Sequence, residues 1–230
     1  MKVGKVIPQD FHIWENRASA VLMVFGCNMQ CPYCHSPNFV RGRMSSIDWL
    51  PQIKRVVHSI DSVVITGGEP LIQNYLPVVC KKLKLEGLKV RIETNGSKPG
   101  VLESLIKRKV VDSVALDVKA PFNEYKSITR SQVDPERIKK SMELLKSSGI
   151  DYELRTTWSP DLIEEQILEV AKQCSNSTWV LQQFVPGNCL DENYNHKEQT
   201  PYEKIKEVAS RAEGPSRVFI RTNKGVELVR

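Results

Sequence analysis

Short apolar segments with the composition of buried strands alternate along the chain with segments of helical periodicity. The six strand candidates are residues 18–25, 62–65, 89–92, 113–116, 152–157 and 179–184. The helical candidates between and after them are residues 47–60, 75–85, 101–110, 135–148, 161–174 and 201–212. Repeated strand–helix alternation predicts right-handed βαβ units and a parallel sheet. The alternation alone is compatible with a six-stranded partial (β/α) barrel and with an open, doubly wound sheet.

The length of the chain predicts its domain organisation. A chain of 230 residues can bury one sizeable core, so we expect a single domain over residues 1–230. Residues 1–17 are expected to be an extended lead-in, and residues 216–230 a final strand and tail. No apolar run is long enough for a membrane span, and the N-terminus lacks the apolar core of a secretory signal. We therefore expect a cytoplasmic protein without a membrane partner.

The basic charge of the chain is distributed rather than concentrated. The formal net charge is +6, but the lysines and arginines are spread along the predicted helices. A basic surface could meet a nucleotide, RNA or an acidic protein. Because no compact basic block with interleaved aromatic residues is present, we expect a solvated surface and no nucleic-acid partner.

Three cysteines follow the first predicted strand within eight residues: Cys27, Cys31 and Cys34. Their spacing, C-x3-C-x2-C, brings three thiolates together on one loop. Thiolates are the ligands that zinc and iron–sulfur clusters prefer. Three ligands leave one coordination position open, whereas a closed structural zinc site takes four. The motif therefore predicts a metal centre that can also bind a substrate.

The remaining cysteines and the adjacent histidine do not complete a zinc site. His35 is too close to Cys34 to join the same tetrahedron comfortably, and no second C-x-x-C pair exists. Cys80 and Cys174 fall at apolar helical positions and are expected to be buried packing residues. Cys189 lies in a predicted loop, where we expect a stray thiol.

Polar clusters follow nearly every predicted strand. In parallel α/β folds the C-terminal ends of the strands form the active face, so we expect these clusters to converge with the cysteine loop. After the second to the sixth predicted strand they are residues 66–70, 93–96, 117–119, 155–158 and 182–188.

The glycine pair and the polar residues after the third strand have two interpretations each. Gly67 and Gly68 permit a close backbone approach to a ligand, although a Gly-Gly pair is also typical of a plain turn. Glu93, Thr94 and Asn95 place a carboxylate, a hydroxyl and an amide at one strand end. Turn or helix capping by Thr94 or Asn95 is the alternative interpretation.

Charged residues at the fourth and fifth strand ends also admit two interpretations. Asp117 and Lys119 are two residues apart, so both point to the same side of a strand. A purely structural ion pair is their alternative role. Arg155 is a permanently charged bidentate donor that suits a carboxylate or a ribose, and a surface salt bridge is its alternative.

The cysteine segment carries a specific family resemblance. Its residues, Cys-Asn-Met-Gln-Cys-Pro-Tyr-Cys over 27–34, resemble the signature of the radical S-adenosylmethionine (radical SAM) enzymes. The following His35 makes the segment similar to glycyl-radical-enzyme activases, above all to those of anaerobic ribonucleoside-triphosphate reductases. The resemblance implies a partial (β/α)6 TIM-like barrel with a [4Fe–4S] cluster and S-adenosylmethionine (SAM) as cofactors. It favours this barrel over the open sheet.

The resemblance also implies roles for individual residues. Cys27, Cys31 and Cys34 would hold the cluster, and Tyr33 would pack near the adenine. Outside the cysteine segment, the residues that would contact SAM are Gly67, Gly68, Glu69, Glu93, Thr94, Asn95, Asp117, Lys119 and Arg155. Some activases have a histidine at the end of the sixth strand, and this chain has Gln182-Gln183-Phe184 there instead.

The activase resemblance implies a reaction and its partners. SAM is cleaved reductively to a 5′-deoxyadenosyl radical, which generates a glycyl radical on the anaerobic ribonucleotide reductase. A flavodoxin or a ferredoxin would donate the electron. Two other interpretations stay open. One is a small-molecule radical SAM enzyme such as a 7-carboxy-7-deazaguanine synthase, which has a similar Glu-Thr-Asn-Gly segment. The other is a zinc-dependent nucleic-acid-binding module.

Overall fold

The computed structural model describes residues 1–230, which form two compact units. The first unit comprises Met1–Asn28, Asn38–Ala115 and Arg137–Asp151. The second unit comprises Met29–Pro37, Leu116–Glu136 and Tyr152–Arg230. The chain thus passes several times from one unit to the other, and the expected single domain stays a prediction.

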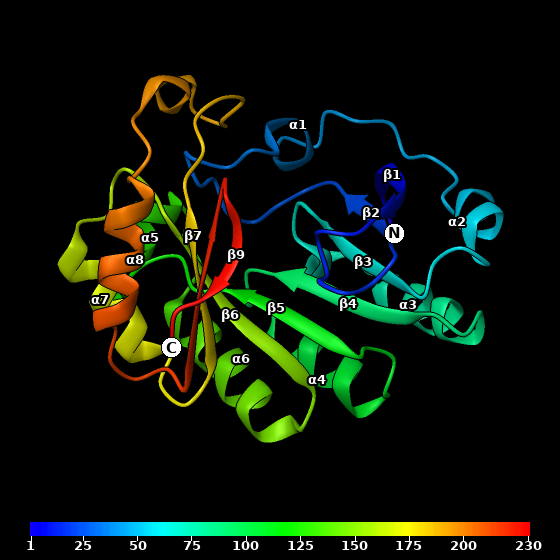
Figure 1. Cartoon of the computed structure of the whole chain (residues 1–230). Coiled ribbons are helices and arrows are strands. Elements are labelled where there is room, and N and C mark those ends of the chain that lie inside the picture. Colours follow the sequence, from blue (N-terminus) through cyan, green and yellow to red (C-terminus); the bar gives the residue numbers. More distant parts are fainter. The chain divides into compact units, whose positions relative to one another are not determined.

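Four strands lie entirely within the first unit (Figure 1): β1 (Val3–Asp10), β2 (Ser19–Val24), β3 (Ser62–Gly67) and β4 (Lys89–Thr94). β2 pairs with β3 and β3 with β4 in parallel, as the alternation predicts, whereas β1 pairs with β2 antiparallel. The expected lead-in thus contains a strand. Only Val3 of β1 is buried, so the strand lacks the apolar pattern of its neighbours.

Helices follow the strands of the first unit as predicted. They are α1 (Pro37–Val40), α2 (Leu50–Val56), α3 (Leu76–Leu85), α4 (Pro99–Lys107) and α6 (Pro135–Ser148). A proline lies in the first turn of α2, α3 and α4, where its missing N–H costs no hydrogen bond. The helix predicted over residues 47–60 is shorter, because it begins only next to its proline. Cys80 is buried on α3, as expected.

The strands of the second unit are β6 (Asp151–Trp158), β7 (Thr178–Gln183), β8 (Arg217–Thr222) and β9 (Gly225–Leu228). β6, β7 and β8 are parallel neighbours, and β9 returns antiparallel to β8. The expected tail is therefore the second arm of a hairpin, drawn in red in Figure 1. α7 (Glu164–Gln173) and α8 (Tyr202–Arg211) pack against each other, and α8 also packs on β7 and β8.

The strand β5 (Ser113–Asp117) begins in the first unit and ends in the second. Before its first residue, the Asp112 N–H donates to the Val90 carbonyl over 2.8 Å. After its last residue, the Val118 N–H donates to the Arg155 carbonyl over 2.8 Å. With β5, each of the six predicted strands is present. None of the helices is both long and apolar enough to cross a membrane.

Two leucines on α3 provide a test of the first unit's core. Leu83 is fully buried, whereas Leu85 is 77% exposed two residues later. We expect Leu83→Ala to lower the free energy of unfolding by about 2–5 kcal/mol, because it leaves a cavity among close-packed side chains. Leu85→Ala should change it by less than about 0.5 kcal/mol. Urea denaturation measures both, and equal effects would contradict the assigned face of α3.

Candidate active site

Gly67 and Gly68 bring the end of β3 against the end of β2. Gly67 has a φ of +109°, which favours glycine, and the Gly68 N–H donates to the Val24 carbonyl over 2.7 Å. A Cβ on Gly68 would lie 2.1 Å from the carbonyl oxygen of Gly26. The close approach that the glycines permit is thus made by the backbone that leads into the cysteine loop.

The carboxylate of Glu69 is a buried acceptor that joins the loops after β3 and β4. Its side chain is almost fully buried, with 1% of the residue exposed. Oε1 accepts from the Leu71 N–H over 2.9 Å and from the Thr94 hydroxyl over 2.6 Å, and Oε2 accepts from the Asn95 N–H over 2.8 Å. Charge-assisted hydrogen bonds of this kind compensate the burial of a carboxylate. Glu69 therefore holds the two loops together.

Thr94 and Asn95 are buried and hydrogen-bonded within the same unit. The Thr94 hydroxyl donates to Glu69 and accepts from the Gly96 N–H over 3.0 Å. The Asn95 side-chain amide donates to the side-chain oxygen of Asn28 over 2.9 Å and accepts from the Ser97 N–H over 3.0 Å. The capping interpretation therefore describes part of what these residues do, and Asn28 is a member of the group that the sequence analysis did not select.

Glu93 points in a different direction from its two neighbours. Its carboxylate is half-buried and accepts a hydrogen bond from the Thr66 hydroxyl of β3 over 2.9 Å. Thr66 and Glu93 lie near the ends of the adjacent parallel strands β3 and β4. The ends of both strands therefore carry polar side chains.

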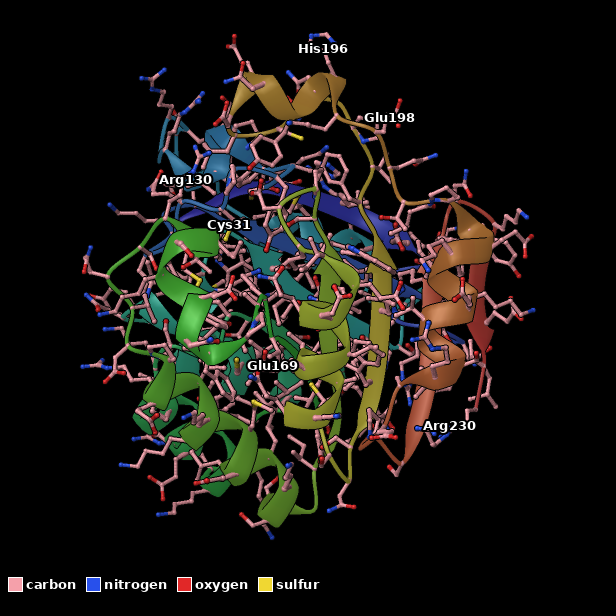
Figure 2. All side chains as sticks on the ribbon, turned by 90° about the vertical axis from the view of Figure 1, so that its left-hand side faces the viewer. Cys31, Arg130, Glu169, His196, Glu198 and Arg230 are labelled. Atoms are coloured by element: carbon pink, nitrogen blue, oxygen red, sulfur yellow. The ribbon has the colours of Figure 1, made fainter.

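The cysteine loop of the second unit is held through its backbone. The Gln30 N–H donates to the carbonyl of Thr129, the last residue of α5 (Tyr125–Thr129), over 3.0 Å. The Leu190 N–H donates to the Cys34 carbonyl over 2.9 Å. Figure 2 shows Cys31 beneath Arg130, which directly follows α5. Cys31 and Cys34 are thus free thiols on a loop that is fixed from two sides.

Burial keeps both thiols protonated in the absence of a metal. It raises the pKa of Cys31 to about 11, although the nearby Lys119 ammonium opposes the shift. Burial raises the pKa of Cys34 as well. Since the native thiol of Cys31 holds its proton more tightly, its contribution to stability is complete below pH 9.0 and is lost as the pH rises towards 11. A metal that binds these thiolates must therefore displace protons.

Tyr33, between the two cysteines, has an unsatisfied polar atom. The residue is 7% exposed, and its buried hydroxyl has no hydrogen-bond partner of ordinary geometry, although it lies close enough to the Cys31 thiol to lower the pKa of that thiol. Burial, with the nearby Cys31, raises the pKa of Tyr33 well above its ordinary value, so the hydroxyl stays neutral. Buried polar groups are normally paired, so this hydroxyl is a candidate for a bond to a bound molecule.

Asp117 joins the two predicted cations of the second unit. Arg155 Nε donates to Oδ1 over 2.9 Å, and Lys119 Nζ donates to Oδ2 over 3.1 Å. The hydroxyl of Tyr125 donates to the Asp117 carbonyl over 3.1 Å and accepts from the Lys119 N–H over 3.3 Å. Tyr125 is a member of this group without any motif in the sequence to mark it.

The two cations decide the protonation state of Asp117. Burial disfavours the carboxylate, but the Arg155 guanidinium and the Lys119 ammonium outweigh it and hold the pKa below the ordinary value of 3.8. The pKa of Lys119 is raised well above its ordinary value, because Asp117 outweighs the desolvation of the ammonium. The structural ion pair is therefore present, and it carries one more positive than negative charge.

His35 contacts the segment after β7, and Cys189 is part of that segment. His35 is exposed, and its Nε2 lies 2.5 Å from the Val185 carbonyl oxygen. Cys189 is 4% exposed, and its N–H donates to the Asn195 side chain over 2.7 Å. The contact of His35 joins the segment after β7 to the residue next to the cysteine loop, whereas the bond of Cys189 lies within the segment.

The sequence pattern of the radical SAM superfamily matches residues 21–174, which is more than half of the chain. The chain belongs to the radical SAM superfamily. This match includes each predicted site residue, from Cys27 to Arg155. The resemblance seen in the cysteine segment is confirmed.

Two relatives with assigned names are similar to this chain. A protein of Methanocaldococcus jannaschii named "putative glycyl-radical enzyme activating enzyme" is 33% identical over 225 residues, which cover 92% of each chain. A 7-carboxy-7-deazaguanine synthase of Neisseria meningitidis serogroup B is 33% identical over 110 residues, which cover 47% of this chain and 48% of the synthase.

A solved structure of similar fold confirms the fold class. SuiB of Streptococcus suis, bound to S-adenosylmethionine, matches with a TM-score of 0.63 at 16% identity. The match covers 88% of this chain and 51% of SuiB, so the chain spans about half of that protein's length. The predicted partial (β/α)6 TIM-like barrel is therefore confirmed, and it is preferred over the alternative of an open, doubly wound sheet.

Radical SAM enzymes use a [4Fe–4S] cluster and SAM, and this chain uses the same two cofactors as a member of the superfamily. Its residues fit them. Cys31 and Cys34 are free thiols near the Lys119 ammonium, and Tyr33 offers an unpaired hydroxyl. Three thiols without a fourth ligand suit a cluster with one open iron. Within neither unit do three His, Cys, Asp or Glu side chains form a complete metal site by themselves.

Gly68 provides a test of the contact between the ends of β2 and β3. Gly68→Ala places a methyl group 2.1 Å from a backbone oxygen that cannot move independently. We expect the free energy of unfolding to fall by about 1–3 kcal/mol or more. Gly100→Ala is the matched control, because a Cβ on this residue of α4 meets nothing within 4 Å. It should stabilise the radical SAM enzyme by up to about 1 kcal/mol.

Asp117→Asn tests the ion pairs of the second unit. A carboxylate with a lowered pKa stabilises the fold above pH 3.8 and loses this contribution as the pH falls through the lowered pKa. We expect the substitution to cost about 1.5–3 kcal/mol at pH 7, and the difference from the wild type to shrink near pH 3. Urea denaturation at both pH values measures this. The exposed Asp151→Asn is the control, and an equal cost at both pH values would contradict the interpretation.

Proposed function

We propose that this radical SAM enzyme is an activase that generates a glycyl radical on a large protein, an anaerobic ribonucleoside-triphosphate reductase. The observation that carries the activase function is the similarity to the M. jannaschii protein over 92% of both chains, whereas the reductase as the target is implied by the resemblance of the cysteine segment. A similarity of this extent is much longer than the cysteine segment alone. His35 after the last cysteine and the pair Asp117 and Lys119 support the same function.

The proposed site consists of the cysteine segment, whose residues are close in the sequence, and of residues at the ends of the strands. Cys27, Cys31 and Cys34 would hold the cluster, which would supply the electron for the cleavage of SAM to methionine and a 5′-deoxyadenosyl radical. Tyr33 packs near the adenine, and its unpaired buried hydroxyl supports a contact with a bound molecule. The backbone of Gly67 accepts a hydrogen bond from the amino group of SAM.

The charges of Asp117, Lys119 and Arg155 support a second part of the proposal. SAM presents an ammonium, a carboxylate and a ribose. Arg155 and Lys119 carry one positive charge more than Asp117 neutralises, which suits the SAM carboxylate. The half-buried carboxylate of Glu93 suits the ammonium or a ribose hydroxyl.

The overall reaction balances with one external electron. A flavodoxin or ferredoxin donates the electron, the S–C5′ bond of SAM breaks, and methionine leaves. The 5′-deoxyadenosyl radical then takes one hydrogen atom from the Cα of a glycine in the reductase. The products are 5′-deoxyadenosine and the glycyl radical, and the electron donor is oxidised by one electron.

A small-molecule reaction of the 7-carboxy-7-deazaguanine synthase type is the second candidate. The observation in its favour is the local similarity to the N. meningitidis synthase, which covers 47% of this chain. The activase is preferred because the similarity to the M. jannaschii protein extends over nearly the whole length of both chains.

Anaerobic reconstitution with iron, sulfide, reductant and SAM tests the proposal. We expect formation of 5′-deoxyadenosine. Adding the anaerobic reductase from the same host should give the doublet of a glycyl radical in electron paramagnetic resonance. Cys31→Ala should abolish SAM cleavage, because a cluster ligand is lost. Cys80→Ala, which removes a buried thiol on α3, should keep it within about twofold.

The possible outcomes separate the two candidates. SAM cleavage without the glycyl-radical doublet would favour the small-molecule reaction. No SAM cleavage by the reconstituted wild type would contradict both. Cleavage by Cys31→Ala at the wild-type rate would contradict the assignment of the cluster ligands.

A further inference from the structure

A cluster of three polar side chains connects the residue after Cys27 to the loop after β4. Its members are Asn28, Asn95 and Ser97, and it is called the asparagine cluster here. The Asn28 Nδ2 donates to the Ser97 hydroxyl over 2.8 Å, and the Asn95 Nδ2 donates to the Asn28 Oδ1 over 2.9 Å. The Ser97 N–H closes the cluster by donating to the Asn95 Oδ1 over 3.0 Å.

The loop that carries Asn95 and Ser97 is fixed from two further elements. The backbone N–H of Asn95 donates to the buried Glu69 carboxylate over 2.8 Å. The Ser141 hydroxyl of α6 donates to the Gly96 carbonyl over 2.6 Å. Asn95 and Ser97 are 4% and 1% exposed, so water does not compete for their hydrogen bonds. Asn28 is therefore attached to a rigid support.

Cys27 lies between two anchored residues. On one side, the Gly26 N–H donates to the Phe39 carbonyl over 2.7 Å, and the Gly26 carbonyl accepts from the Glu69 N–H over 2.8 Å. On the other side, the asparagine cluster holds the Asn28 side chain. Consecutive Cα atoms are about 3.8 Å apart, so anchors at both neighbours leave the Cα of Cys27 little freedom.

Thr94 and Asn95 have most of their hydrogen-bonding capacity occupied within the protein. The Thr94 hydroxyl donates to Glu69 and accepts from the Gly96 N–H. The Asn95 amide both donates and accepts within the asparagine cluster. Local capping explains the bond between Asn95 and Ser97, but it does not explain a bond between Asn28 and Asn95 across 67 positions of sequence.

We infer that Asn28, Asn95 and Ser97 are positioning residues for Cys27, and that Asn95 acts in this way rather than by contacting SAM. The inference rests on the proposed function, because it needs Cys27 to be a cluster ligand. Polar residues behind a metal ligand set the orientation of that ligand, and their loss typically lowers metal affinity about 10–100-fold. The asparagine cluster sets the orientation of Cys27 through the backbone of Asn28.

Iron release from the reconstituted full-length protein tests the inference. The wild type and the variants are loaded anaerobically with the [4Fe–4S] cluster, and the transfer of iron to a chelator is followed by absorbance. Asn28→Ala removes both side-chain hydrogen bonds, and we expect it to release iron about tenfold faster or more. Asn74→Ala, which changes an exposed asparagine of the same unit, should release iron at the wild-type rate.

Asn28→Asp separates positioning from a general loss of structure. Its carboxylate keeps the size of the amide and accepts from both the Asn95 amide and the Ser97 hydroxyl, which can turn to donate. We expect iron release within about twofold of the wild type. Thermal unfolding of the metal-free proteins shows whether each variant is folded. If Asn28→Ala does not fold, Ser97→Ala replaces it, because this change removes only one hydroxyl.

Each outcome supports or overturns the inference. Release from Asn28→Ala or its substitute at the wild-type rate would overturn it. Fast release from both Asn28→Ala and Asn28→Asp would also overturn it, because hydrogen bonding would not be the cause. A wild type that binds no cluster would refute the proposed function itself. A wild type that binds the cluster and cleaves SAM, with unchanged variants, would refute only the positioning role.

Discussion

The burial of the Glu69 carboxylate is the constraint on which the functional end of the first unit depends. An ionised carboxylate is costly to bury unless hydrogen-bond donors surround it. Here the donors are the Leu71 N–H after β3 and the Thr94 hydroxyl and Asn95 N–H at the end of β4. Since the charge is satisfied only when both loops are in place, they have one position relative to each other. The entrance to the cysteine loop at Gly26 is bonded to the same Glu69 through its backbone.

In the second unit, the main electrostatic feature is the group of charges around Asp117. One carboxylate is shared by Arg155 and Lys119, which leaves positive charge near thiols that must lose their protons to bind a metal. Burial alone keeps Cys31 and Cys34 neutral, and Lys119 opposes that effect without overcoming it. The metal therefore has to complete the deprotonation. A cluster held by these thiols would therefore bind with release of protons.

Periodic patterns predicted most of the fold, and the exceptions have physical causes. The helix over residues 135–148 matches α6 (Pro135–Ser148) at both ends, because its apolar stripe and its proline are local signals. The strand β1 was expected only as an extended segment, since a strand with one buried residue has little apolar alternation. The arm β9 was expected as a tail, because most of its residues are exposed and its pairing with β8 leaves no apolar pattern in the sequence.

The sequence by itself determined the chemistry of the protein, because the spacing of Cys27, Cys31 and Cys34 is a local property of the chain. It also placed polar residues after the strands, which predicts where the site lies. Only the tertiary structure decided how those polar groups are used. Glu69 and Asn95 are engaged by partners within the protein, whereas Tyr33 has an unpaired buried hydroxyl. Hydrogen bonds such as that between Asn28 and Asn95 join residues 67 positions apart, so they exist only once the strands between them have packed.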